Sequence, residues 1–306
     1  MVQAATERSN RVKILLDGGT FFEGPRWHDG AWWVSDFYAH RVLRVSPEGV
    51  AEVVANVPNR PSGLGFLPDN SLLIVSMQDR KVLHRHTDGA LSEYADLAAV
   101  TGGYANDMVV DRHGRAYVGN LGFDLFGGGT PAATSLVRVD PDGTVVVVAD
   151  DLWCPNGTVI SADGKTLIVA ESFAARLTAF TIEASGDLSE RREWAAFGPP
   201  PAFDSVDTIM KAAFAPDGCA IDAENHVWVA DALAGRACRV AAGGRIVDEV
   251  RAPNDFGIYA CALGGEDGRT LVLCAAPDFS DVKRAAAREA VLYAHEVSVP
   301  HGGGLP

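Results

Sequence analysis

Positively charged residues are scarce in this sequence relative to acidic ones. Lysine and arginine total 26 against 40 aspartate and glutamate residues, which gives a formal net charge of −14 at pH 7. A charge of that sign is repelled by phosphate backbones and by anionic membrane surfaces. We therefore expect no nucleic acid and no membrane among the partners of this protein.

Long apolar runs are also absent. The longest stretch without Asp, Glu, Lys or Arg is the thirteen residues from Leu125 to Val137, which is too short to cross a bilayer as a helix. The first ten residues, Met1 to Asn10, are polar and lack the apolar run and the cleavage site of a secretory signal. The expected compartment is the cytoplasm.

Cysteine pairs and helical periodicity are missing as well. The five cysteines are dispersed, odd in number and without a Cys-x-x-Cys pair, which argues against a disulfide framework or a thiolate metal site. One short segment, Asp281 to Arg288, is the only candidate helix. A chain with 47% hydrophobic residues and so little helical pattern is expected to be all-β.

What the sequence does contain is a pattern that recurs six times, at intervals of about 40 to 60 residues. Each repeat opens with a small or polar residue, often followed by glycine, and continues as short apolar strands joined by turns. The openings are Glu23-Gly-Pro-Arg-Trp, Ser62-Gly-Leu-Gly-Phe, Asn106-Asp-Met-Val-Val, Asn156-Gly-Thr-Val-Ile, Asp217-Gly-Cys-Ala-Ile and Tyr259-Ala-Cys-Ala-Leu. Turns such as Asp29-Gly30 supply the positive φ that tight hairpins need.

The strand pattern predicts four strands in each of the first five repeats. The sixth repeat has no fourth strand after Val297, whereas Arg11 to Leu16 forms a strand before the first repeat. We predict that this N-terminal strand completes the last sheet and closes a six-bladed β-propeller of four-stranded blades. A single domain would span residues 1–306, with flexible tails at 1–10 and 300–306. A β-sandwich is the competing architecture, but it does not explain a sixfold period.

The first strand of each propeller blade lies innermost, so the residues that open these strands should meet around the axis. They are Glu23, Ser62, Asn106, Asn156, Asp217 and Tyr259, with Asp107 beside Asn106. Carboxylates that face one another in a partly dehydrated funnel are unfavourable, and a bound cation removes the penalty. Such oxygens suit calcium, magnesium or manganese, and zinc is tolerated. Alternatively, Asn-Gly and Asp-Gly are turn dipeptides that only shape the strand starts, although glutamate has no such preference.

Four motifs carry a resemblance to a known family. They are Glu23-Gly-Pro-Arg-Trp, Asn106-Asp-Met-Val-Val-Asp, Pro155-Asn156-Gly and Pro216-Asp217-Gly-Cys-Ala-Ile-Asp, in this order. Together they resemble the gluconolactonase / senescence marker protein (regucalcin) family of six-bladed propellers. The resemblance implies one divalent metal ion held by Glu23, Asn156 and Asp217, and hydrolysis of a lactone ring. It also implies that Asn106 contacts the substrate or the metal-bound water.

The sequence departs from the sugar-lactone members at one point. An arginine that helps to hold sugar hydroxyls in some of them would fall near Tyr104, so a less polar lactone becomes an alternative to a sugar lactone. Phe123, in the glycine-rich segment 122–129, and Trp153 could form an aromatic wall; alternatively, Phe123 and Phe126 only pack the loop. The candidate substrate contacts are Asn106, Tyr104, Ser62, Phe123, Trp153 and Tyr259.

The implied chemistry is the opening of a lactone ring by metal-activated water. Asp217 is the first candidate for the general base and Asp107 the second, with Asn106 as the third member of the catalytic set. The partner would be a small-molecule lactone, and we expect a monomer or a weak homodimer. Two alternatives remain: a non-enzymatic propeller that binds calcium or another ligand through the same oxygens, and a metal-dependent hydrolase of other esters.

Overall fold

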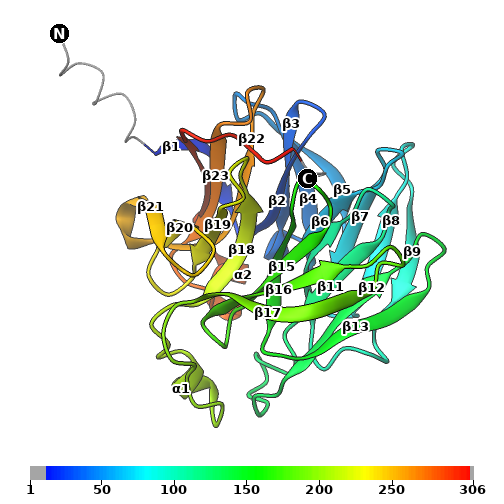
Figure 1. Cartoon of the computed structure of the whole chain (residues 1–306). Coiled ribbons are helices and arrows are strands. Elements are labelled where there is room, and N and C mark those ends of the chain that lie inside the picture. The colour runs from blue at the N-terminus through cyan, green and yellow to red at the C-terminus, as the bar shows by residue number, and fades with distance from the viewer. Residues whose placement is uncertain (1–11, 304–306) are drawn as a thin grey trace.

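The computed structural model describes residues 12–303 of the chain. Six four-stranded antiparallel sheets stand in a ring (Figure 1), so the predicted six-bladed β-propeller is confirmed. The first strands of neighbouring blades contact one another around the ring. They therefore surround the axis, as a propeller requires.

The strands follow one another across each blade. The first blade comprises β2 (Phe22–His28), β3 (Ala31–Asp36), β4 (Arg41–Val45) and β5 (Ala51–Asn56), and the second comprises β6 (Pro61–Phe66), β7 (Leu72–Ser76), β8 (Lys81–Arg85) and β9 (Leu91–Asp96). The third comprises β10 (Ala105–Val110), β11 (Ala116–Asn120), β12 (Thr134–Val139) and β13 (Val145–Leu152), and the fourth β14 (Pro155–Ile160), β15 (Thr166–Glu171), β16 (Arg176–Ile182) and β17 (Leu188–Ala196). The fifth comprises β18 (Pro216–Ile221), β19 (Val227–Asp231), β20 (Arg236–Val240) and β21 (Ile246–Arg251), and the sixth β22 (Gly257–Gly264), β23 (Thr270–Ala276), β24 (Ala290–Glu296) and β1 (Lys13–Gly19).

The N-terminal strand closes the ring, as the sequence predicted. Strand β1 pairs antiparallel with β24, from Lys13 opposite Ala294 to Gly19 opposite Ala290. It begins later and extends further than the predicted segment, whose first residue, Arg11, lies outside the described part of the chain. This pairing joins the two ends of the chain in the sixth blade and covers an edge that would otherwise be open.

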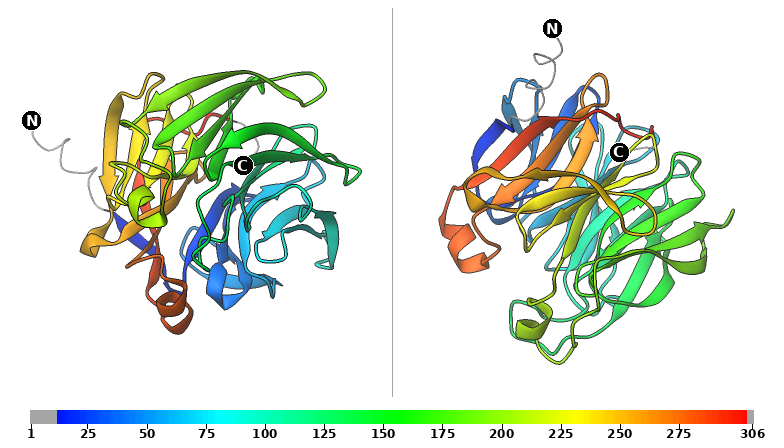
Figure 2. Two further views of the ribbon diagram at one scale, coloured as in Figure 1. Left: turned by 90° about the horizontal axis from the view of Figure 1, so that it is seen from below. Right: turned by 60° about the vertical axis from the view of Figure 1, so that its left-hand side comes forward.

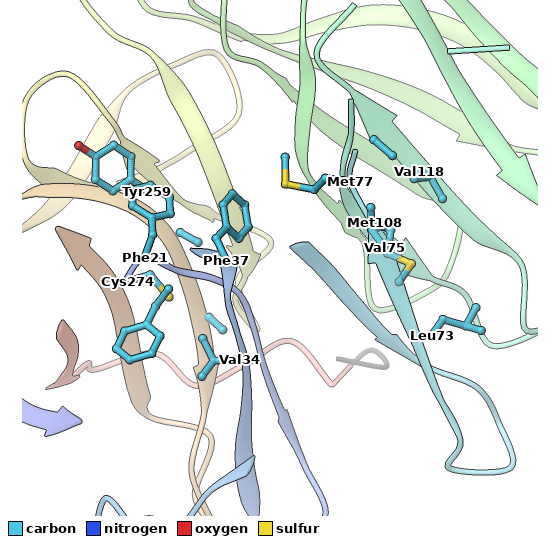
Figure 3. Close-up of a cluster of buried hydrophobic side chains, with 14 of the residues drawn as sticks. Phe21, Val34, Phe37, Leu73, Val75, Met77, Met108, Val118, Tyr259 and Cys274 are labelled. Carbon is cyan, nitrogen blue, oxygen red and sulfur yellow. The ribbon is translucent and has the colours of Figure 1, made fainter. Parts of the chain in front are cut away.

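Apolar side chains fill the space between neighbouring blades. The largest cluster spans the first, second, third and sixth blades, and Figure 3 shows part of it, including Leu73, Val75 and Val118, which are fully buried. The same cluster continues to Phe21 and Tyr259. Dense packing of this kind holds the inner strands in fixed positions.

The glycines in the repeated openings lie inside strands and do not form turns. A Cβ atom on Gly63 would lie 2.6 Å from the backbone nitrogen of Met108, and one on Gly157 would lie 2.3 Å from the carbonyl oxygen of Asp217. Gly218 is equally close to the backbone of the next inner strand. The interpretation of the Asn-Gly and Asp-Gly pairs as turn dipeptides is therefore wrong, because glycine is needed here for close approach between blades.

Helices are short and few among the described residues. They are α1 (Val206–Ile209), α2 (Asp281–Ala286) and the 3-10 helices η1 (Phe37–Ala39) and η2 (Pro253–Asp255). Helix α2 falls in the only segment for which the sequence predicted a helix, whereas α1, a single turn at the lower edge of Figure 1, was not predicted. No helix in residues 12–303 has the length and apolar character needed to span a membrane.

The described part of the predicted C-terminal tail is held by hydrogen bonds. The backbone nitrogen of Gly302 donates to the carbonyl of Ile221 over 3.1 Å, and the carbonyl of Pro300 accepts from Ala223 over 2.9 Å. Residues 300–303 therefore lie against the fifth blade, where their backbone groups find partners. They end on the side of the ring away from α1 (Figure 2). The predicted tails at 1–10 and 304–306 lie outside the described residues.

Candidate active site at the propeller axis

Each inner strand changes register next to the residue that opens it. In β2 the irregularity falls between Glu23 and Arg26, and the other five inner strands have one at the corresponding place. An irregularity of this kind redirects side chains away from the regular alternation of a strand. Five of the six predicted axial residues then line one pocket of about 800 Å³, a volume that includes its open mouth: Glu23, Asn106, Asn156, Asp217 and Tyr259.

Burial and nearby negative charge disfavour the charged forms of the two carboxylates on the pocket floor. Burial, followed by the charges of Asp217 and Asp107, raises the pKa of Glu23 well above its ordinary value. Burial, followed by the charge of Asp107, also raises the pKa of Asp217 well above its ordinary value. Two acids with raised pKa values, neither of which forms a salt bridge within residues 12–303, make a site that favours a cation.

The hydrogen bonds on the pocket floor leave oxygen atoms free. Asp217 Oδ1 is buried and has no hydrogen-bond partner. Asn156 uses its amide nitrogen to donate to Ser172 Oγ over 3.2 Å, so its carbonyl oxygen is left for another partner. These oxygens, with the carboxylate of Glu23, fit the hard ligand set that a divalent cation requires. In residues 12–303 no three His, Cys, Asp or Glu side chains gather as a metal site, so a cation here needs an amide oxygen as well.

The two axial asparagines present opposite ends of their amides. Ser62, which is buried, donates from its hydroxyl to Asn106 Oδ1 over 3.2 Å. The amide nitrogen of Asn106 is therefore the group left to act as a donor, whereas Asn156 is left with an acceptor. Ser62 does not line the pocket; it orients Asn106, which does.

Asp107 is neutralised within the chain. Arg26 donates from Nη2 to Asp107 Oδ1 over 3.0 Å and to the carbonyl oxygen of Met108 over 2.6 Å, and both charged side chains are buried. Asp107 is not among the residues that line the pocket. Because Arg26 holds the carboxylate of Asp107 outside the pocket, Asp217, which lines it, becomes the better of the two candidate bases.

The wall of the pocket is apolar and follows the sixfold repeat. Every blade contributes an apolar residue one to three positions after its second strand: Phe37, Met77, Leu121, Phe173, Leu233 and Phe279. Ile209 and Met210, at the end of α1, and Phe21 add to the same wall. The sequence interpretation missed these residues, although an apolar residue shortly after the second strand of every repeat is a signal that could have revealed them.

The predicted aromatic residues lie at different depths around this wall. Tyr259 lines the pocket, and Tyr104 stacks on Phe126, a lining residue, with 6.1 Å between ring centroids. Phe123 is buried behind the wall and packs on Phe173, with 5.7 Å between centroids. Trp153 stacks on Phe203, and neither residue lines the pocket. Tyr104, Phe123 and Trp153 therefore support the wall from behind.

The amino-acid sequence is similar to that of proteins named as lactonases. Pentonolactonase XacC of Haloferax volcanii is 27% identical over 258 residues, which cover 83% of this chain and 81% of that protein. Among solved structures, the calcium-binding protein regucalcin of Agrobacterium tumefaciens matches with a TM-score of 0.76 and 21% identity over 95% of both chains. The luciferin-regenerating enzyme matches with a TM-score of 0.79 and 19% identity over 97% of this chain and 98% of that one. The two structural matches show the common fold.

The family is settled by a match over most of the chain. Residues 21–277 match the SMP-30/Gluconolactonase/LRE-like region, and this range begins two residues before Glu23 and includes every inner strand. The chain therefore belongs to the SMP-30/gluconolactonase/LRE-like family.

Proposed function

We propose that the protein is a metal-dependent hydrolase that opens lactone rings. Lactone hydrolysis in general is supported by the family and by the similarity to a pentonolactonase. The observation that carries the proposal is the unpartnered Oδ1 of Asp217, buried on a floor that it shares with Glu23. The ligands would be Glu23, Asn156 and Asp217, and the ion would be calcium, magnesium, manganese or zinc.

The residues on the floor would have separate roles in the reaction. A divalent ion, when bound, supplies polarisation of the lactone carbonyl and lowers the pKa of a water molecule. Asn106 donates from its amide nitrogen to the carbonyl oxygen of the substrate, where negative charge develops during attack. Asp217 accepts the proton of the attacking water at its carboxylate and returns it to the ring oxygen when the ring C–O bond breaks. Arg26 keeps Asp107 out of this role.

A lactone panel in a pH-indicator assay tests the proposal. The protein should release acid from at least one lactone, lose this activity with a chelator and regain it with one of the four ions. Phenyl and alkyl esters in the same panel decide whether lactones are preferred over open-chain esters. Metal-dependent melting without turnover of any lactone or ester would instead identify a binding protein that uses the ion for stability alone.

A further inference from the structure

We propose that the substrates are lactones with an extended apolar substituent and not sugar lactones. This inference rests on the proposed lactone hydrolysis and names its substrate class. The reason lies in how polar and apolar groups are divided in the pocket, where Glu23, Asn106, Asn156, Ser172 and Asp217 carry the polar side chains of the floor. A floor of this kind can bind one ester group.

The walls above that floor have few side chains that could form hydrogen bonds with hydroxyl groups. The six residues that follow the second strands are all Phe, Leu or Met, and Ile209 and Met210 extend the same surface. In residues 12–303 the charged side chains that line the pocket are Glu23 and Asp217, both on the floor. Each hydroxyl of a sugar ring placed between these walls would give up water without gaining a partner, whereas an alkyl chain or an aromatic ring would gain by burial.

Aromatic rings form a continuous surface along one side of the pocket. Phe21 packs against Phe37, with 5.4 Å between ring centroids, and against Tyr259, with 4.7 Å. Phe279 continues the series beyond Tyr259, with 6.4 Å between centroids, and is itself 41% exposed. An apolar surface that runs from the floor to an exposed phenylalanine suits a chain longer than the lactone ring itself.

The cationic group beside the mouth is already engaged. The guanidinium of Arg60 lies 4.8 Å from the ring centroid of Tyr38 and 6.0 Å from that of Phe126. Its Nη2 is also 3.9 Å from a carboxylate oxygen of Asp281, on α2. Because these groups occupy Arg60, its guanidinium is not free to bind an acidic or phosphorylated sugar.

The test is a series of γ-lactones that share one ring and carry alkyl chains from methyl to octyl, compared with gluconolactone. For the metal-loaded protein we expect kcat/KM to rise about threefold with each added methylene, mainly through KM. Leu233→Ser, in the wall, should flatten this dependence. Leu91→Ser is the matched control, since Leu91 lies on the outer strand β9, and it should preserve the dependence.

The possible outcomes separate this inference from the proposed function. Faster hydrolysis of gluconolactone, or rates independent of chain length, would overturn the apolar substrate class and leave lactone hydrolysis standing. If no lactone is hydrolysed, calorimetry with alkyl γ-lactams, which resist hydrolysis, decides the ligand class. Tighter binding of longer lactams would then support apolar recognition while the hydrolase proposal fails, and the absence of any such trend would overturn both.

Three pairs of a buried acid and a partly exposed arginine carry a second inference. They lie at the ends of the second strands of the first, fourth and fifth blades: Asp36–Arg41, Glu171–Arg176 and Asp231–Arg236. Each acid also accepts from a backbone nitrogen just before the inner strand of its own blade: Phe21 over 3.3 Å, Trp153 over 2.9 Å and Ala215 over 3.2 Å. The three acid side chains are fully buried.

The blades that carry these pairs are the blades that carry the proposed metal ligands. The three backbone nitrogens precede Glu23, Asn156 and Asp217 by two or three residues. At the same strand position the other three blades have the uncharged residues Ser76, Asn120 and Ala276. The geometry points to Asp36, Glu171 and Asp231 as positioning residues that fix the backbone from which the ligands project, a role that rests on the proposed metal site.

Metal affinity, measured by calorimetry on chelator-treated protein, tests this role. Asp231→Asn should weaken binding of a divalent ion about tenfold, as the loss of an outer partner does in other metal sites. Asn120→Ala removes buried hydrogen bonds at the matched position of a blade without a ligand, and it should lower the melting temperature with the affinity unchanged. Should Asp231→Asn fail to fold, Arg236→Gln breaks the same pair.

The comparison of the two variants decides the question. A weaker affinity in the fifth-blade variant alone supports the positioning role. Equal affinities in both variants and the wild type, or equal losses in both, would overturn it and leave the pairs with a purely structural role. A wild-type protein that binds no divalent ion would overturn it too, since there would then be no ligands to position.

Discussion

Acidic side chains at the two ends of the propeller axis differ in their partners. At the end away from the pocket, Asp111 and Asp222 follow inner strands and are each paired with an arginine, Arg115 at 2.6 Å and Arg239 at 2.6 Å. Both acids also accept hydrogen bonds from the backbone of the hairpin turn. At the pocket end, the buried Glu23 and the partly buried Asp217 share the pocket floor, and Asp217 keeps a buried oxygen without a partner.

This difference distinguishes charged groups that stabilise the fold from charged groups that are available to bind a ligand. A buried acid with an arginine and backbone donors is satisfied by the chain itself, so it needs nothing from solution. The acids on the pocket floor are not satisfied in this way, and the nearest guanidinium, that of Arg26, is already held by Asp107. Substitutions at the two ends should therefore have different effects, on function at one end and on stability at the other.

The largest effect is expected for Asp217→Ala. This change removes a proposed ligand together with the proposed base, so kcat/KM for any hydrolysed lactone should fall about a thousandfold or more. The fold should persist, because the change relieves repulsion with Glu23. Steady-state kinetics and a thermal melt on the same preparation check both statements. An active variant, or one that is unfolded, would remove the distinction between the two ends.

Arg239→Met should have the opposite profile. It leaves the fully buried Asp222 without its cation, and the loss of one partner of a buried pair costs about 3 kcal/mol of unfolding free energy. The kcat of the folded protein should stay at the wild-type value, because Arg239 lies at the far end of the axis. Urea unfolding followed by tryptophan fluorescence measures the first quantity, and a loss of kcat at constant stability would contradict the assignment.

Glu23→Gln tests the pocket end with a smaller change. The amide keeps the shape of the side chain but removes its charge, so affinity for the divalent ion should weaken by more than about tenfold. Glu224→Gln is the matched control, because Glu224 is exposed and pairs with Arg239 at the other end. Metal content after dialysis and calorimetric titration provide the readout; equal affinities in the two variants would count against Glu23 as a ligand.

The ring and the residues on its axis could be predicted because their signals are local and repeated. The turn residues Asp29 and Gly30 adopt the positive φ that the sequence predicted for the hairpins, and the residue that opens each inner strand comes at a fixed point of the repeat. The role of Gly63 and Gly157 could not be predicted, since it depends on how closely one inner strand approaches the next.

The walls of the pocket were predicted less well for a related reason. Phe123 and Trp153 were proposed as wall residues because aromatic side chains in loops are conspicuous in a sequence. The structure places them behind the wall, while Met77 and Leu233, which are ordinary apolar residues, face the pocket. Which loop side chains face the axis depends on how the ring closes. Helix α1, which ends next to Met210, is only one turn long, so its sequence shows no helical periodicity from which it could be predicted.

The smallest expected effect is a pH dependence that belongs to the pocket end alone. Burial raises the pKa of Glu23 and Asp217, so between about pH 4 and the folded-state pKa values the metal-free native state binds more protons than the unfolded state. Its unfolding free energy should therefore fall as pH rises through that window. A divalent ion replaces those protons, so it should stabilise the protein more at about pH 7.5 than at about pH 5, by about 1 kcal/mol.

Thermal melts with and without the ion at the two pH values measure this difference. In the double variant Glu23→Gln, Asp217→Asn it should vanish, since neither side chain then titrates. In Arg239→Met it should persist, because the pair at the other end does not face the ion. An ion effect that is equal at both pH values in the wild type would mean that the acids on the floor are not the groups that compete with protons for the cation.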